Sequence, residues 1–133
     1  MQLKTIFSAL LIAFAVVSCN QTVNSQNTAS VVNIDGAKFV EMAKDSNTVI
    51  IDVRTPGEVA EGYIPGTKYF MDYNGGKFES EFKTLDTSKT YIIYCRSGGR
   101  SSSASNQMIQ SGFKKVYNLS GGISNWSGDI KKD

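Results

Sequence analysis

The sequence contains no histidine, and this absence limits the chemistry open to its two cysteines. Without histidine there is no Cys–His catalytic pair and no histidine-based metal site, so a reactive thiol has to be activated by backbone dipoles and arginine side chains. An excess of one charge is also missing, since 14 Lys and Arg stand against 12 Asp and Glu. This balance leaves no basic footprint for nucleic acid, and we expect no nucleic-acid partner.

The longest apolar run is too short for a comfortable membrane span. It extends from Ile6 to Val17 behind Lys4, whereas a spanning helix needs about 20 residues. This layout is typical of a signal peptide. The run stops directly before Cys19, an arrangement that resembles the lipobox of bacterial lipoproteins. Residues 1–18 are therefore predicted to be a signal peptide and Cys19 a lipidated residue that anchors the protein to a bacterial membrane, facing the periplasm or the cell exterior. An ordinary secretory signal and an uncleaved anchor remain as alternatives.

The next segment, residues 19–30, is rich in Asn, Gln, Ser and Thr and carries no charge. It has too little apolar surface to offset the entropy of ordering, so we predict a flexible tether. Residues 31–133 show no internal repeat and are enough for one domain. If Cys19 is lipidated, Cys95 is the only thiol left in the mature chain, and an unpaired cysteine in an exported protein suggests reactivity.

Cys95 lies where a strand pattern turns into a helix pattern. Four β-favouring residues precede it, and a loop with two glycines and two arginines leads to Ser101, where a helix is expected to begin. Converging backbone N–H groups and the helix dipole would stabilise a thiolate and lower the thiol pKa from about 8.5. The alternative is a core cysteine that ends a buried strand, a role that requires neither Arg96 nor Arg100 beside it.

Strand and helix patterns alternate along the domain. Strands are expected at residues 31–33, 48–53, 67–71, 90–94 and 116–119, and helices at 35–44, from Pro56 after a Thr55 cap, at 77–85, at 101–110 and around Trp126. In the first helix Phe39, Val40 and Ala43 are expected to face inward. The alternation predicts an α/β domain with a mainly parallel sheet of about five strands, covered by helices on both faces. Ligands of such domains bind at the carboxyl ends of the strands.

Three ordered motifs in this domain resemble the rhodanese family of sulfurtransferases. Residues 95–100, Cys-Arg-Ser-Gly-Gly-Arg, resemble the active-site loop of that family, which often reads C-R-x-G-x-R. Residues 51–56 with Glu58, followed by residues 61–66, form the second motif, and Gly121-Gly122-Ile123 with Trp126 the third. The resemblance implies a three-layer rhodanese-like fold over residues 31–133. One motif departs from the family, because Tyr63 stands where relatives often carry a histidine, so no role of that histidine transfers.

The resemblance also implies a mechanism. Cys95 would take the outer sulfur of a donor such as thiosulfate, form a persulfide and pass the sulfur to a thiol or to cyanide, without metal or cofactor. The family loop would bind the anionic sulfur with the residues that follow the cysteine, namely Arg96, Ser97, Gly98, Gly99, Arg100 and Ser101. Arg96 would hold an anionic donor at the rim or simply be a solvated charge.

Supporting ion pairs and two other functions complete the prediction. Arg100 is expected to pair with Asp52 and brace the loop, and Arg54 to pair with Glu58. A cysteine phosphatase or arsenate reductase is one alternative, although its loop has seven residues from Cys to Arg and this loop has six. A non-catalytic binding or redox-sensing module is the other, because an exposed low-pKa thiol can also be oxidised.

Overall fold

The computed structural model describes residues 29–133. The predicted signal peptide at 1–18, the lipidation of Cys19 and nearly all of the 19–30 tether lie outside these residues. Within 29–133 no helix is long and apolar enough to cross a membrane. The elements in chain order are β1 (Val32–Ile34), α1 (Gly36–Met42), β2 (Thr48–Asp52), α2 (Pro56–Ala60), β3 (Thr67–Phe70), α3 (Lys77–Glu81), the 3₁₀ turn η1 (Phe82–Thr84), β4 (Thr90–Tyr94), α4 (Gly99–Gln110), β5 (Lys115–Leu119) and the 3₁₀ turn η2 (Ile123–Asn125).

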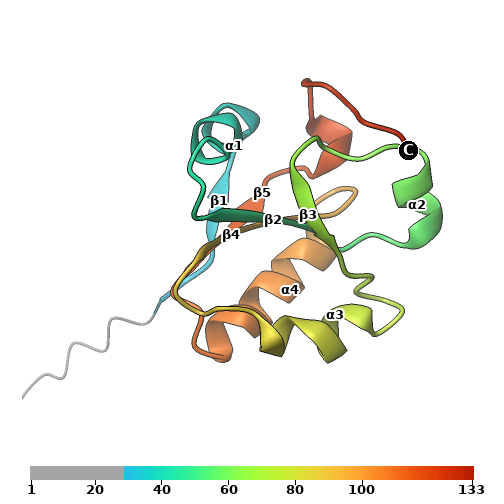
Figure 1. Ribbon diagram of the computed structural model, residues 1–133. Coiled ribbons are helices and arrows are strands. Elements are labelled where there is room, and N and C mark those ends of the chain that lie inside the picture. Colours follow the sequence, from blue (N-terminus) through green and yellow to red (C-terminus); the bar gives the residue numbers. More distant parts are fainter. Residues whose placement is uncertain (1–28) are drawn as a thin grey trace, which may run out of the picture.

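All five strands of the described residues join one parallel sheet in the order β1-β5-β4-β2-β3. The central pair, β2 and β4, stays in register from Thr48–Thr90 to Asp52–Tyr94. Figure 1 shows α1 on one face of the sheet and α3 and α4 on the other, with α2 beyond one end of the strands. The predicted α/β fold with helices on both faces of a parallel sheet is confirmed.

The two central strands are buried on both faces. Ile51 and Ile93 face the core formed with α3 and α4, whereas Ile50 and Ile92 face the core formed with α1. Successive side chains of a strand point to opposite faces, so a strand covered on both sides needs apolar residues at nearly every position. The continuous β-branched runs in the sequence are the consequence of this double coverage.

The phase of α1 differs from the prediction. Asp35 caps the helix by accepting a 2.8 Å hydrogen bond from the N–H of Lys38. From this start Phe39 turns inward and is 2% exposed, and Met42, three residues later, packs against the same core. Val40 is 48% exposed and Ala43 is also exposed, so the expectation that both face inward was wrong.

Two other helix predictions need correction at their ends. The helix expected over residues 77–85 is divided into α3 and the tighter turn η1, and Phe78 and Phe82 are both buried. The helix expected around Trp126 is the single turn η2, and Trp126 follows it in extended conformation. Its indole packs on Phe39 with ring centroids 4.9 Å apart, in agreement with a packing role.

Candidate active site

Cys95 directly follows β4 at the edge where the parallel strands end. Its side chain is 1% exposed, and its carbonyl accepts a 2.9 Å hydrogen bond from the N–H of Ile123. The carbonyl of Arg96 accepts a second bond, also 2.9 Å, from the N–H of Ser124. Turn η2 therefore holds the first two residues of the cysteine loop, residues 95–101, in place.

Gly122 explains how η2 comes so close to this loop. A Cβ atom at Gly122 would lie 2.5 Å from the carbonyl oxygen of Cys95, and its φ angle of +58° is left-handed. Only glycine combines this backbone conformation with so close an approach. The sequence marked the glycine pair at 121–122 as part of a family motif, but its role as the support of the cysteine loop is visible only in the structure.

Hydrogen-bond donors surround the sulfur atom. The N–H of Gly98 donates to Sγ of Cys95 over 3.1 Å, and the hydroxyl of Ser101 lies 3.3 Å from Sγ. Gly98 adopts φ +105° and is the N-cap of α4, so the sulfur faces the first turn of a twelve-residue helix. No side chain caps this helix start. Its first N–H groups and the positive end of its dipole are thus directed toward the loop.

These donors shift the thiol toward its anion. Burial raises the pKa of Cys95, but the hydroxyl of Ser101 and the backbone N–H groups of Ser101, Gly98 and Ser97 lower it, and the net direction is downward. The two effects oppose each other because burial removes the water that would solvate the thiolate, whereas the hydrogen-bond donors take the place of that water. The loop therefore stabilises the Cys95 thiolate with backbone and hydroxyl donors, and no histidine is needed for this.

The ion pairs around the loop differ from those predicted. Both terminal nitrogens of Arg100 donate to the carboxylate of Glu58, each over 2.8 Å, rather than to Asp52. Arg54 donates to Asp52, with the shortest distance 2.7 Å, rather than pairing with Glu58. The two predicted pairs were wrong in partner although they involve the same four residues.

Local geometry explains the exchange of partners. Asp52 ends β2, and the chain bends at Arg54, two residues later. The Asp52 carboxylate accepts hydrogen bonds both from the Arg54 guanidinium and from the backbone N–H of Arg54. Both are buried, at 0% and 5% exposure. The Arg54 guanidinium donates further to the carbonyl oxygens of Gly62 and Glu58, at 2.8 and 3.2 Å. The Asp52 carboxylate is thus occupied by hydrogen bonds from Arg54, its near neighbour in the sequence.

Glu58 is free to hold Arg100 because of its place in the first turn of α2. The Thr55 hydroxyl accepts a hydrogen bond from the N–H of Glu58 over 3.3 Å. The Glu58 carboxylate in turn accepts from the N–H and the hydroxyl of Thr55, both over 3.0 Å. This is a capping box, with Pro56 at the first helical position as predicted. The carboxylate thus links the start of α2 to the start of α4.

The remaining predicted residues lie on the rim. Arg96, Ser97 and Gly99 are exposed, and within residues 29–133 the Arg96 side chain takes part in no ion pair. Its guanidinium is therefore available to an anion near Cys95. Tyr63 lies elsewhere, and its hydroxyl donates to Asp133 over 2.8 Å.

Fold and site together define a class of protein, an α/β domain that presents an anion-stabilising cysteine loop at the carboxyl edge of a parallel sheet. The sequence model of the rhodanese-like domain family matches residues 35–129, most of the domain described above. The chain belongs to this family.

Individual relatives agree with this assignment. The chain is 33% identical over 86 residues to a sulfurtransferase of Allochromatium vinosum, covering 65% of this chain and 78% of the relative. It is 32% identical over 94 residues to the thiosulfate sulfurtransferase GlpE of Pseudoalteromonas translucida, covering 71% and 87%. Among solved structures, a rhodanese-related protein from Thermoplasma volcanium has a TM-score of 0.66 at 25% identity, covering 77% of this chain and 99% of that one. The protein is thus a rhodanese-like domain with sulfurtransferase relatives.

Replacing Ser101 by alanine should raise the pKa of the Cys95 thiol. The hydroxyl is the strongest of the groups that lower this pKa, and burial would then oppose ionisation with less compensation. The pH profile of Cys95 alkylation, followed by peptide mass spectrometry, should move to higher pH. The matched control is Ser103→Ala in the same helix, where the side chain is exposed. An unchanged profile in Ser101→Ala would contradict the assigned donor.

Glu58→Gln should alter stability in acid. Hydrogen bonds from Arg100 lower the pKa of Glu58 to about 2, so its contribution to stability is complete above its unfolded pKa of about 4.5 and is lost as the pH falls toward 2. Denaturant titrations should show a loss of about 1–2 kcal/mol at neutral pH, after allowance for solvent screening, and a flatter acid limb. Glu41→Gln, in an exposed pair with Lys38, should leave both nearly unchanged. An acid limb equally steep in Glu58→Gln would refute the role of this pair.

Proposed function

We propose that this protein is a sulfurtransferase that carries sulfane sulfur as a persulfide on Cys95. The observation that carries the proposal is the set of donors around Sγ, with the N–H of Gly98 at 3.1 Å and the hydroxyl of Ser101 at 3.3 Å. A reaction whose nucleophile is a thiolate and whose intermediate ends in an anionic sulfur requires donors at this place. The sulfurtransferase relatives support the same reaction class.

The proposed reaction has two halves that balance. In the first, the Cys95 thiolate attacks the outer sulfur of thiosulfate, the sulfur–sulfur bond of the donor breaks, and sulfite leaves with the electron pair. In the second, the acceptor, a thiolate or cyanide, attacks the terminal sulfur of the persulfide and the Cys95 thiolate returns. Arg96, exposed on the rim, offers a cation to the anionic donor and to the departing sulfite.

The engagement of Arg100 argues against the phosphatase alternative. A phosphatase loop uses its arginine to bind the oxygens of the phosphate, whereas both terminal nitrogens of Arg100 are bonded to Glu58. Releasing them would leave the half-buried Glu58 carboxylate without its partner, at a cost of about 1–2 kcal/mol. The donors that remain at the loop suit a single sulfur atom better than a tetrahedral oxyanion.

Intact-mass spectrometry after mixing with thiosulfate tests the sulfur transfer. We expect the wild-type protein to gain the mass of one sulfur atom, and cyanide or a small thiol to remove it. Cys95→Ser should gain nothing, and Ser103→Ala, at an exposed position of α4, should load like wild type. No gain in a folded protein whose Cys95 is still alkylated would exclude thiosulfate as donor and favour the binding or redox-sensing module.

We also propose that the domain is exported and held at a bacterial membrane through a lipid on Cys19. Support comes from the apolar run that stops directly before this residue and from the uncharged segment after it. In a bacterial host, the full chain should partition into the membrane fraction, and Cys19→Ser should release it into the soluble exported fraction. A Cys19→Ser variant that stays in the membrane would point to an uncleaved anchor instead.

A further inference from the structure

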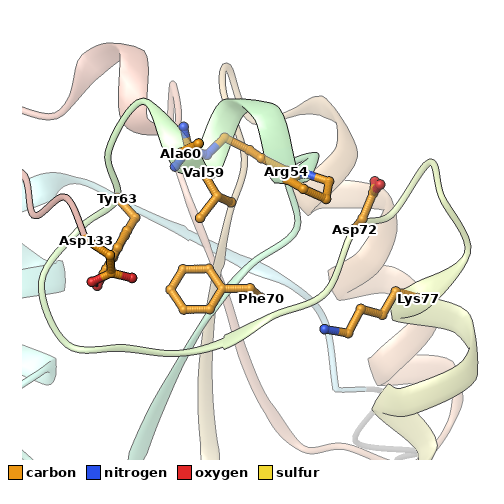
Figure 2. A pocket seen from close by; sticks show the side chains of 9 residues that line it. Arg54, Val59, Ala60, Tyr63, Phe70, Asp72, Lys77 and Asp133 are labelled. Carbon is orange, nitrogen blue, oxygen red and sulfur yellow. The ribbon is translucent and has the colours of Figure 1, made fainter.

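Cys95 lies outside the cavity beside α2. This cavity has a volume of about 450 Å³, Figure 2 shows Val59, Tyr63 and Phe70 around it, and no residue of the cysteine loop lines it. Cys95 itself is 1% exposed. The groups that meet its sulfur therefore belong to the loop, and the directions in which the peptide N–H groups of the loop point decide how well an anionic sulfur is stabilised.

Turn η2 fixes the orientation of two peptide units of the cysteine loop. The carbonyl of Cys95 shares a planar unit with the N–H of Arg96, and the carbonyl of Arg96 shares the next unit with the N–H of Ser97. In a trans peptide the carbonyl and the N–H point in opposite directions. The N–H groups of Ile123 and Ser124 hold these two carbonyls, each over 2.9 Å. The N–H ends of both units are therefore turned away from η2.

The second of these N–H groups faces the sulfur. The N–H of Ser97 is one of the backbone groups that lower the pKa of Cys95, beside that of Gly98, which lies 3.1 Å from Sγ. Successive N–H groups that converge on one atom form an anion-binding nest. If the Arg96–Ser97 peptide rotated, its carbonyl oxygen would replace the N–H and turn a negative dipole toward the thiolate. The hydrogen bond from Ser124 opposes this rotation, because the rotation would break it.

The same segment supports Gly98. A Cβ atom at Gly98 would lie 3.5 Å from the backbone nitrogen of Gly121 and 3.9 Å from the carbonyl oxygen of Leu119. The N–H of Gly122 donates to that same carbonyl over 3.0 Å, which closes the turn beside Gly98. Residues 119–124 thus contact the parts of the loop that supply both N–H groups.

Trp126 anchors η2 on the side of α1. Its N–H donates to the carbonyl of Ile123 over 3.1 Å, so the indole is attached directly to the end of the turn. The indole packs on Phe39 of α1, and its Nε1 donates to the carbonyl of Asp129 over 3.0 Å. The position of η2 is therefore set by packing on the face of the sheet opposite to α4.

We propose that Ser124 and Trp126 are positioning residues for sulfur transfer and act through the Arg96–Ser97 peptide. Ser124 acts with its backbone N–H, which holds the Arg96 carbonyl away from the sulfur, and Trp126 acts by holding η2 against Phe39. The link to catalysis rests on the proposed function. The orientation of the loop N–H groups concerns the thiolate itself and is tested without a sulfur donor.

Two substitutions at position 124 separate the backbone from the side chain. Ser124→Pro removes the N–H at a position whose 3₁₀ conformation suits the φ angle of proline, and Ser124→Ala removes only an exposed hydroxyl. In Ser124→Pro the pH profile of Cys95 alkylation should move to higher pH, and loading from thiosulfate at neutral pH should slow at least about tenfold. Ser124→Ala should match wild type in both. An unmoved profile in Ser124→Pro would overturn the proposal.

Variants of Trp126 keep every backbone N–H and extend the test beyond the proline. Trp126→Ala should loosen η2 and move the alkylation profile in the same direction, and Trp126→Phe, which still packs on Phe39, should bring it back toward wild type. Phe113→Leu is the control, because Phe113 is buried against Tyr91 near the start of β4. It should lower the free energy of unfolding and leave the profile in place. A Trp126→Ala profile like that of Phe113→Leu would show that Trp126 only packs.

The two measurements distinguish a failure of this inference from a failure of the proposed function. Alkylation reports the Cys95 thiolate and requires no sulfur donor. If wild type gains no sulfur and the profile still moves in Ser124→Pro, the positioning of the thiolate donors stands and the sulfurtransferase proposal fails. If wild type gains sulfur and the profile of Ser124→Pro does not move, the positioning role alone is refuted.

Discussion

The bidentate ion pair between Arg100 and Glu58 joins the two segments on which the site depends. Arg100 belongs to the first turn of α4, within the cysteine loop, and Glu58 to the first turn of α2. The Glu58 carboxylate is itself held by Thr55, so four donors fix its two oxygens. Exposed pairs such as Lys38–Glu41 contribute about 0.3–0.5 kcal/mol, and this half-buried, bidentate pair contributes more because its geometry is set on both sides.

The second pair, Asp52 with Arg54, has a different task. Both side chains are buried, and removing either would leave an unpaired charge inside the protein, which costs about 3–5 kcal/mol. The guanidinium also donates to the carbonyl of Glu58, within α2, and to that of Gly62, just after it. The pair thereby fixes how α2 lies over the end of β2, and the Arg100–Glu58 pair then fixes the cysteine loop to α2.

Helix α2 separates two chemically distinct regions. Glu58 extends toward the cysteine loop, whereas Val59 and Ala60 line a cavity with Phe70. On the first side the site stabilises an anion, because backbone and hydroxyl donors lower the pKa of Cys95. On the second side the walls of the cavity are mainly apolar.

The sequence by itself determined the fold class and the order of the strands and helices. The buried strands, the Thr55 cap with Pro56 and Glu58, and the strand-to-helix turn at Cys95 depend on short-range chemistry, which a local pattern records. Tertiary structure alone decided which arginine pairs with which carboxylate, that Val40 faces solvent, that Gly122 supports the loop, and that a cavity forms beside α2. Each of these depends on how segments distant in sequence are oriented, and residue spacing along the chain carries no record of that orientation.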